Sequence, residues 1–283
     1  MNRLDTVFER LRAEHDLGLF PYLMTGYPDP TTCARLLDCV AAAGADGIEL
    51  GVPFSDPLAD GVTIQRVGAA ALEQGASVQM ALELVRQFRT RWQTPVVLMS
   101  YYNLLLAYGT AALCRDSAAA GLDGFIVPDL PLEEAGPFQG LCRDNGLHVI
   151  TMLAPTSTDS RLDRAGKLAS GFIYCVALLG VTGARSELSD ELPAFLQRVR
   201  AQTAAPLVVG FGISRAEHVR AVRGIADGVI VASSLADLID ASPREELHDA
   251  VSQYVRDLKA AARPVGGTSV SERGAAHRQT TAG

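Results

Sequence analysis

Eight short apolar runs, each followed by a stretch with helical periodicity, constrain the fold of this chain most strongly. The runs are rich in Val, Ile and Leu, and most are almost continuously apolar, which is typical of strands covered on both faces. They comprise residues 20–24, 47–50, 96–100, 124–127, 149–153, 171–176, 207–211 and 228–231. Amphipathic stretches between them predict helices, among them residues 31–43, 77–91, 132–145, 190–202 and 216–222. This alternation predicts parallel βαβ units.

Eight such units favour an α/β fold of the closed (β/α)8 TIM-barrel type over its alternative, an open doubly wound sheet. The length of 283 residues fits one barrel of about 250 residues with a tail. An extra N-terminal helix over residues 4–14 precedes the first strand and is expected to cover the bottom of the barrel. Residues 264–283 contain almost no large apolar side chains, which predicts a disordered tail after a single domain, residues 1–263.

Charge and cysteine usage exclude several classes of function. The net charge of −7 argues against a nucleic-acid-binding protein. The five cysteines form no CxxC pair and have no metal-ligand spacing, so we expect neither a disulfide framework nor a metal site. The N-terminal segment lacks the apolar core of a signal peptide, and no apolar run approaches the roughly 20 residues of a membrane span. These features predict a cytoplasmic protein with no membrane partner.

Two carboxylic residues lie where a barrel enzyme places its chemistry, at the C-terminal ends of the strands. Glu49 lies inside the second apolar run, and alternation directs its side chain toward the barrel interior. Burial raises the pKa of a carboxyl group, which suits a group that gives and takes a proton near neutral pH. Asp60 ends the loop that follows, which is shaped by two prolines and by Ser-Asp and Asp-Gly turns. We interpret Asp56 in that loop as structural.

Three turns rich in Gly, Ser and Thr predict a phosphate site. They follow the sixth, seventh and eighth apolar runs, at residues 180–184, 210–214 and 231–234, and a short helical segment follows the last. Barrels often bind phosphate with the loops after strands seven and eight and a helix N-terminus. Backbone N–H groups there hold an anion without Lys or Arg, which suits an acidic protein.

Apolar side chains near the strand ends predict a dry slot for a flat aromatic ring. They are Tyr22, Met99, Tyr101, Ile126, Met152 and Tyr174, of which Ile126 and Met152 also fit a core role. Asn103 and Asp129 follow the third and fourth runs. We expect them to order loops or to orient Asp60, not to act directly in catalysis.

Five motifs together resemble the tryptophan synthase alpha subunit family. They are IELGVPFSDPLADG at residues 48–61, YYN at 101–103, PDLPLEE at 128–134, GVTG at 180–183 and GFGIS at 210–214. The motifs occur in family order with matching spacing over about residues 1–260. The first motif is long and specific, whereas the glycine turns alone are not.

The resemblance implies a lyase of tryptophan biosynthesis that cleaves indole-3-glycerol phosphate to indole and glyceraldehyde 3-phosphate by a retro-aldol reaction. It implies that Glu49 moves protons between indole C3 and the 3′-hydroxyl, and that Asp60 binds the indole N–H. The remaining site residues that it implies are Gly183, Gly212 and Ser233 for phosphate, Tyr22, Met99, Ile126 and Tyr174 for the indole slot, and Tyr101 and Thr182 as further contacts.

The resemblance also implies a beta subunit, an α2β2 heterotetramer, and no cofactor in this chain, with pyridoxal phosphate on the beta subunit. Several positions depart from the family pattern: Val62, Leu104, Ala177 to Leu179, and Ala232. The first three departures lie near mobile loops and the partner face, so they put loop closure and coupling in doubt. Ala232 replaces a glycine beside the phosphate, a small change if its φ angle is negative.

Three other functions stay open at the level of sequence. The loop departures motivate a stand-alone indole-3-glycerol phosphate lyase that releases free indole. A regulatory binding protein on the same barrel is disfavoured because Glu49 and Asp60 are intact. A different phosphate-binding isomerase is disfavoured by the specificity of residues 48–61.

Overall fold

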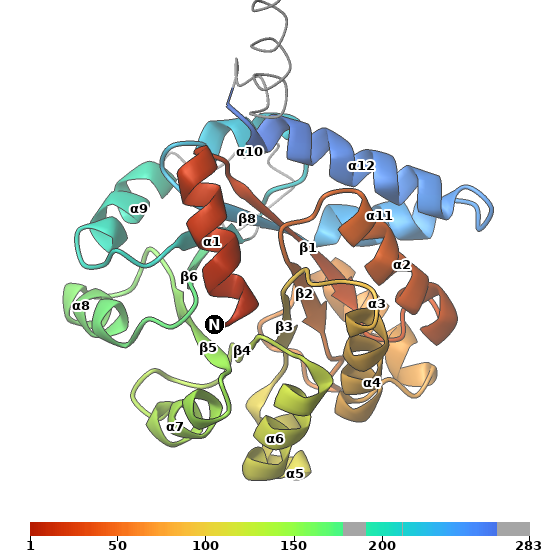
Figure 1. Cartoon of the computed structure of the whole chain (residues 1–283), viewed down its shortest axis with the longest axis horizontal. Coiled ribbons are helices and arrows are strands. Elements are labelled where there is room, and N and C mark those ends of the chain that lie inside the picture. Colours follow the sequence, from red (N-terminus) through yellow and green to blue (C-terminus); the bar gives the residue numbers. More distant parts are fainter. Residues whose placement is uncertain (178–190, 211, 265–283) are drawn as a thin grey trace, which may run out of the picture.

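In the computed structural model, eight parallel strands close into a barrel in chain order, and β8 pairs back to β1 (Figure 1). The strands are β1 (Gly18–Met24), β2 (Ile48–Gly51), β3 (Val96–Met99), β4 (Gly124–Ile126), β5 (His148–Leu153), β6 (Ile173–Val176), β7 (Leu207–Gly210) and β8 (Gly228–Val231). The structure describes residues 1–177, 191–210 and 212–264. The closed barrel confirms the predicted fold class and excludes the open sheet.

Helices surround the barrel in Figure 1. They are α1 (Arg3–Glu14), α2 (Pro30–Ala42), α3 (Val62–Glu73), α4 (Val78–Arg89), α5 (Tyr102–Tyr108), α6 (Thr110–Ala120), α7 (Gly136–Asp144), α8 (Asp159–Leu168), α9 (Leu192–Arg200), α10 (Ala216–Val222), α11 (Ser233–Ala241) and α12 (Leu247–Ala262). The helix predicted from residue 132 begins at Gly136, because a turn in which Glu134 N–H donates to the Pro131 carbonyl precedes it. The strand predicted from residue 171 begins at Ile173, after Gly171 with a φ of +71°.

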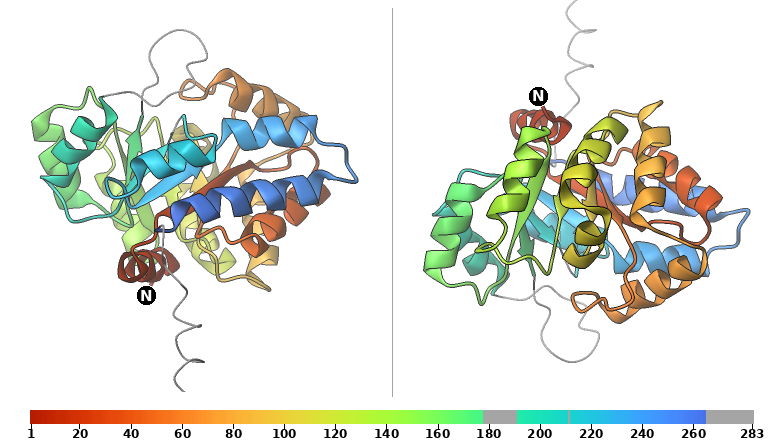
Figure 2. Two further views of the ribbon diagram at one scale, coloured as in Figure 1. Left: turned by 90° about the horizontal axis from the view of Figure 1, so that it is seen from above. Right: turned by 90° about the horizontal axis from the view of Figure 1, so that it is seen from below.

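The extra N-terminal helix closes the bottom of the barrel, as predicted. Figure 2 shows α1 at the end of the barrel opposite to α3. Phe8 of α1 stacks on Phe20 of β1 with ring centroids 5.7 Å apart, and it contacts Phe172 at 5.8 Å. The Asn2 side chain caps α1 and also donates to the Asp123 and Gly146 carbonyls, which anchors the helix to this end. The predicted tail beyond residue 264 lies outside the described residues.

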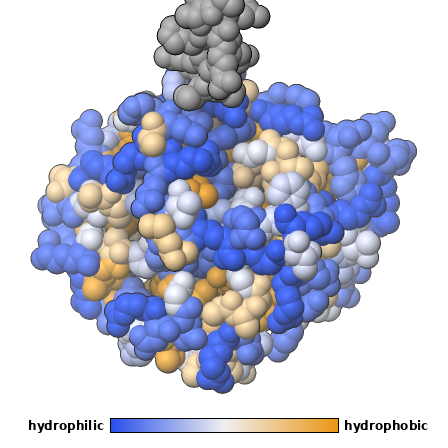
Figure 3. Space-filling model, in the orientation of Figure 1, coloured by the Kyte–Doolittle hydropathy of each residue, from blue (hydrophilic) through white to orange (hydrophobic). Residues whose placement is uncertain are grey.

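Buried side chains divide between the barrel interior and the layer between strands and helices. The interior cluster includes Tyr22, Met24, Val97, Met99, Tyr101, Ile126, Ile150, Tyr174, Val208 and Ile230. Alternating strand residues pack outward against the helices in a second cluster. The outer surface around α1 is mostly hydrophilic, with scattered apolar patches (Figure 3).

Among the described residues, no helix is long and apolar enough to cross a membrane. The expected cytoplasmic location and the domain boundary after residue 263 stay predictions.

Candidate active site

Glu49 points into the barrel, as alternation along β2 predicts. It is in register with Tyr22 of β1 and with Val97 of β3, which both belong to the interior cluster. Its neighbours Ile48 and Leu50 pack in the outer cluster instead. The Glu49 carboxyl group therefore faces the barrel interior.

The Glu49 carboxyl group is buried, and one of its two oxygen atoms has no partner among the described residues. Only 4% of the residue is exposed, and its Oε2 atom has no hydrogen-bond partner within the described part of the chain. The buried carboxylates at the bottom of the barrel differ, since Asp46 pairs with Lys259 at 2.6 Å and Asp123 with Arg89 at 2.8 Å. Burial, reinforced by the charge of Asp60, raises the pKa of Glu49 to about 8. Glu49 is thus a protonated acid at neutral pH.

Asp60 lies at the end of the loop between β2 and α3, directly before the helix N-cap Gly61. The Asp60 N–H donates to the Pro57 carbonyl, and the Asp60 carbonyl accepts from the Gln65 side chain at 2.8 Å. The side chain is partly buried, and burial raises the pKa of Asp60 to about 6. Asp60 is therefore mainly ionised at neutral pH, so the two carboxyl groups carry different protonation states.

Tyr101 anchors the loop that carries Asp60. Its hydroxyl accepts a hydrogen bond of 2.9 Å from the Ala59 N–H, and its polar influence lowers the pKa of Asp60 against the effect of burial. Its ring packs against Phe54 of the same loop, with centroids 5.3 Å apart. Asp129 accepts from the Tyr102 N–H at 2.8 Å, so it orders the start of α5, as expected for a loop-ordering residue.

The predicted slot residues meet in the barrel interior. Tyr22, Met99, Tyr101, Ile126 and Tyr174 all belong to the interior cluster and are nearly fully buried. Burial is the largest cause that raises the pKa of Tyr22 and Tyr174, and the charges of Glu49 and Asp60 add to it. Both phenols therefore stay neutral, and they lie close to the two carboxyl groups.

The predicted phosphate residues are described only in part. Gly212 follows β7 with a φ of +81°, a conformation that favours glycine. Ser233 is the first residue of α11, where helix N–H groups have no partner within the helix. Ala232 has a φ of −118°, so this position does not need the positive φ that favours glycine. Thr182 and Gly183 lie outside the described residues.

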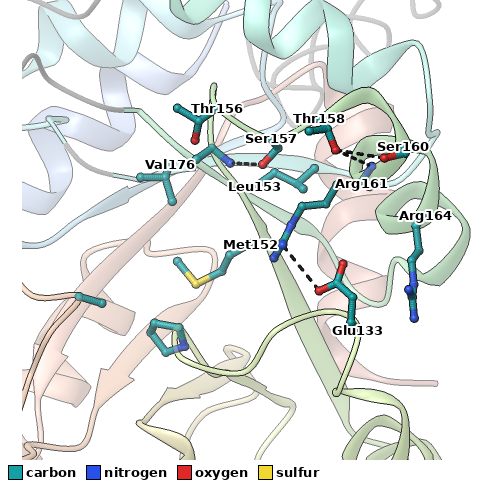
Figure 4. Close-up of a pocket in the computed structure, with 13 residues that line it drawn as sticks. Glu133, Met152, Leu153, Thr156, Ser157, Thr158, Ser160, Arg161, Arg164 and Val176 are labelled. Carbon is teal, nitrogen blue, oxygen red and sulfur yellow. Dashed lines mark hydrogen bonds and ion pairs between the residues drawn. The ribbon is translucent and has the colours of Figure 1, made fainter.

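A cavity of about 720 Å³ opens beside the mouth of the barrel (Figure 4). Its inner wall includes Ala59, next to Asp60, and Met152 and Val176 at the ends of β5 and β6. Across it Arg161 points toward Glu133, 3.7 Å away. Glu49 is not among the residues that line this cavity, so the buried acid lies apart from it.

Comparisons with known proteins agree with this geometry. The family model described as "Tryptophan synthase alpha chain" matches residues 8–263. A tryptophan synthase alpha chain from Roseiflexus sp. (strain RS-1) is 52% identical over 260 residues, covering 92% of this chain and all of the relative. The one from Chloroflexus aurantiacus is 46% identical over 266 residues, covering 93% of this chain and all of the relative.

Solved structures show the same fold. Tryptophan synthase subunit alpha from Legionella pneumophila superposes with a TM-score of 0.85 at 34% identity, covering 93% of this chain and 98% of the other. A chain of tryptophan synthase from M. tuberculosis, in an aminoacrylate-bound form, gives 0.83 at 34% identity, covering 93% and 100%. From its sequence and its structure alike, the chain belongs to the tryptophan synthase alpha chain family.

Proposed function

We propose that Glu49 and Asp60 carry out the retro-aldol cleavage by which this family's lyases convert indole-3-glycerol phosphate to indole and glyceraldehyde 3-phosphate. The observation that carries the proposal is the buried carboxyl group of Glu49, whose Oε2 atom has no partner among the described residues, together with the nearby Asp60 carboxylate. A buried group without a partner is costly to stability, and such costs concentrate at functional sites. The contrast with the paired Asp46 and Asp123 supports a role in chemistry for Glu49.

The different protonation states of the two groups suit the two proton transfers of the reaction. Protonated Glu49 gives its proton to C3 of the indole ring, and the ring becomes a cation. The ionised Asp60 accepts a hydrogen bond from the indole N–H and stabilises that cation. The Glu49 carboxylate then takes the proton of the 3′-hydroxyl. The carbon–carbon bond breaks, its electrons return to the ring, an aldehyde forms, and Glu49 is protonated again.

The remaining interior side chains support the binding part of the proposal. Tyr22, Met99, Ile126 and Tyr174 provide apolar walls in the barrel interior that Glu49 faces, and Tyr101 holds the loop of Asp60. We assign the phosphate to the N–H groups at Gly212 and at Ser233, where α11 begins. Thr182 and Gly183 complete this assignment on the basis of sequence resemblance alone.

A beta chain is the proposed partner, in an α2β2 heterotetramer. Support comes from family membership and from the structural match to a chain of tryptophan synthase from M. tuberculosis. The proposed cleavage uses only side chains of this protein. We assign pyridoxal phosphate to the beta chain. The relatives found here give no support to the stand-alone lyase.

The test measures indole release from indole-3-glycerol phosphate by the purified chain, with and without a tryptophan synthase beta chain. Glu49→Gln should lower kcat by about 10²–10⁴-fold, as for a lost general acid. Glu73→Gln, the same change at an exposed position of α3, is the control and should retain activity. Release that the beta chain accelerates supports the partner. Equal activity of Glu49→Gln and the wild-type protein would contradict the proposal.

A further inference from the structure

Tyr254 of α12 lies between the two described segments of the proposed phosphate site. Its hydroxyl is 2.9 Å from the Ser214 carbonyl in the loop after β7, and 2.7 Å from the Ser234 hydroxyl in the first turn of α11. These partners lie 40 and 20 residues away along the chain. One side chain from the outer helix layer therefore contacts both segments.

The direction of both hydrogen bonds follows from their chemistry. A carbonyl oxygen only accepts, so the Tyr254 hydroxyl donates its single proton to Ser214. The Tyr254 oxygen must then accept the proton of the Ser234 hydroxyl. Since the Ser234 proton is used in this way, its hydroxyl has no proton for a phosphate oxygen. The neighbouring Ser233 hydroxyl and the first N–H groups of α11 are left for the anion.

Ser214 is also held from the other side. Its N–H donates to Nδ1 of His218, 3.3 Å away, and its hydroxyl lies 3.2 Å from the same atom. His218 belongs to α10, so α10 and α12 together fix the backbone of Ser214. Gly212, which is assigned to the phosphate, is two residues earlier in this loop.

We propose that Tyr254 is a positioning residue that fixes the distance between the loop after β7 and the start of α11, and thereby sets the affinity for the phosphate group. The inference rests on the proposed function, because that function places the phosphate at Gly212 and Ser233. Backbone N–H groups bind an anion well only when they are held in place before it arrives. Tyr254 supplies that order without touching the ligand.

The test uses the reverse reaction, in which indole and glyceraldehyde 3-phosphate condense and each substrate has its own KM. Tyr254→Phe should raise the KM for glyceraldehyde 3-phosphate about tenfold, because the hydrogen bonds of its hydroxyl to Ser214 and Ser234 are both lost. The KM for indole, which has no phosphate, and kcat should stay within about twofold. Ser234→Ala removes one of these two hydrogen bonds and should raise the same KM by less, and the double variant should be no worse than Tyr254→Phe, which already lacks both.

Tyr108→Phe is the matched control, because its hydroxyl donates to Asp116 at 2.8 Å and so links the end of α5 to α6, away from the proposed phosphate site. Three outcomes would overturn the role of Tyr254. They are an unchanged KM for glyceraldehyde 3-phosphate, equal rises in the KM values for glyceraldehyde 3-phosphate and indole, or the same rise in Tyr108→Phe. Calorimetric titration with inorganic phosphate separates the two hypotheses. A wild-type protein that binds phosphate more tightly than Tyr254→Phe but cleaves nothing would refute the proposed function and leave the positioning role intact.

Discussion

The hydroxyl of Tyr22 on β1 lies against the backbone of Gly51 on β2, so closely that a Cβ atom at position 51 would be 2.0 Å from it. Gly51 follows Glu49 by two residues, on the same face of the strand. The same arrangement recurs across the barrel, where a Cβ at Gly210 would be 2.1 Å from the Tyr174 hydroxyl. In both places a glycine makes room for a phenol ring beside the proposed reaction site.

Gly51→Ala should therefore destabilise the protein by about 3 kcal/mol, the upper range for overpacking, because the buried Tyr22 ring has little space to move. Gly140→Ala in α7 is the control, since a Cβ there meets nothing within 4 Å and alanine favours the helix. Denaturant unfolding measures both variants. Adding Tyr22→Leu to Gly51→Ala should recover part of the lost stability. If Gly51→Ala lowers the free energy of unfolding equally with Tyr22 and with Leu at position 22, the contact with the Tyr22 ring is not the cause.

The rate of cleavage should depend on pH as a bell. The proposed reaction begins with Asp60 ionised and Glu49 protonated, so kcat/KM should rise through about pH 6 and fall through about pH 8. The two limbs belong to an interacting pair of groups. Asp60→Asn should abolish the acidic limb and, by removing a nearby negative charge, move the basic limb to lower pH. A profile that is flat from pH 5 to pH 9 would contradict this division of roles.

Glu49→Gln should also change how stability depends on pH. The pKa of Glu49 rises from 4.5 to about 8 in the folded protein, so the unfolded chain releases this proton at lower pH than the folded chain does. Between these values the group lowers the stability of the wild-type protein by about 1.4 kcal/mol per pH unit. Glu49→Gln lacks this ionisable group. Its free energy of unfolding, relative to the wild-type protein, should therefore increase from pH 4.5 to pH 8, and the difference should vanish below pH 4.5. Urea unfolding across this range measures it, and a constant difference would argue against a raised pKa.

The barrel and the orientation of Glu49 could be predicted because both depend on local periodicity. Continuous apolar runs indicate strands that are buried on both faces, and a single charged residue within one then has only the interior or the helix layer to face. Glu49 lies two residues from Gly51 and alternates with Ile48 and Leu50, so its direction follows from the chain itself. The start of α7 at Gly136 is harder to predict from the sequence, because the turn between Pro131 and Glu134 has the same apolar pattern as a helix.

The hydrogen bonds that organise the site could not be predicted in the same way. Tyr101 contacts Ala59 from 42 residues away, and Tyr254 contacts Ser214 from 40 residues away. Such contacts depend on how side chains project across neighbouring elements, which periodicity does not encode. From the sequence Tyr101 is expected only as a slot residue and substrate contact, and no motif singles out Tyr254. Their hydroxyl groups are visible as organising elements only in three dimensions.

Tyr101→Phe should shift the acidic limb of the rate profile to higher pH. The Tyr101 hydroxyl lowers the pKa of Asp60, so its removal leaves burial as the main influence and raises that pKa further. The Ala59 N–H also loses its acceptor, which loosens the loop and should lower kcat/KM at pH 7 about tenfold. Tyr102→Phe is the control. The Tyr102 ring packs on Phe138, and removing its hydroxyl should leave the pH profile of kcat/KM unchanged. An acidic limb that does not move in Tyr101→Phe would refute the effect on Asp60.

Ala232→Gly should leave the affinity for inorganic phosphate within about twofold, although glycine is the residue that the family pattern favours there. Ala232 is the N-cap of α11, and its φ of −118° is negative, so alanine avoids the penalty of a left-handed backbone that glycine would remove. Glycine would also leave the unfolded chain more freedom, which should lower stability by up to about 1 kcal/mol. Calorimetric titration and thermal unfolding measure the two quantities. A large gain in phosphate affinity would mean that the Ala232 methyl group crowds the anion, and that this departure weakens substrate binding in the natural chain.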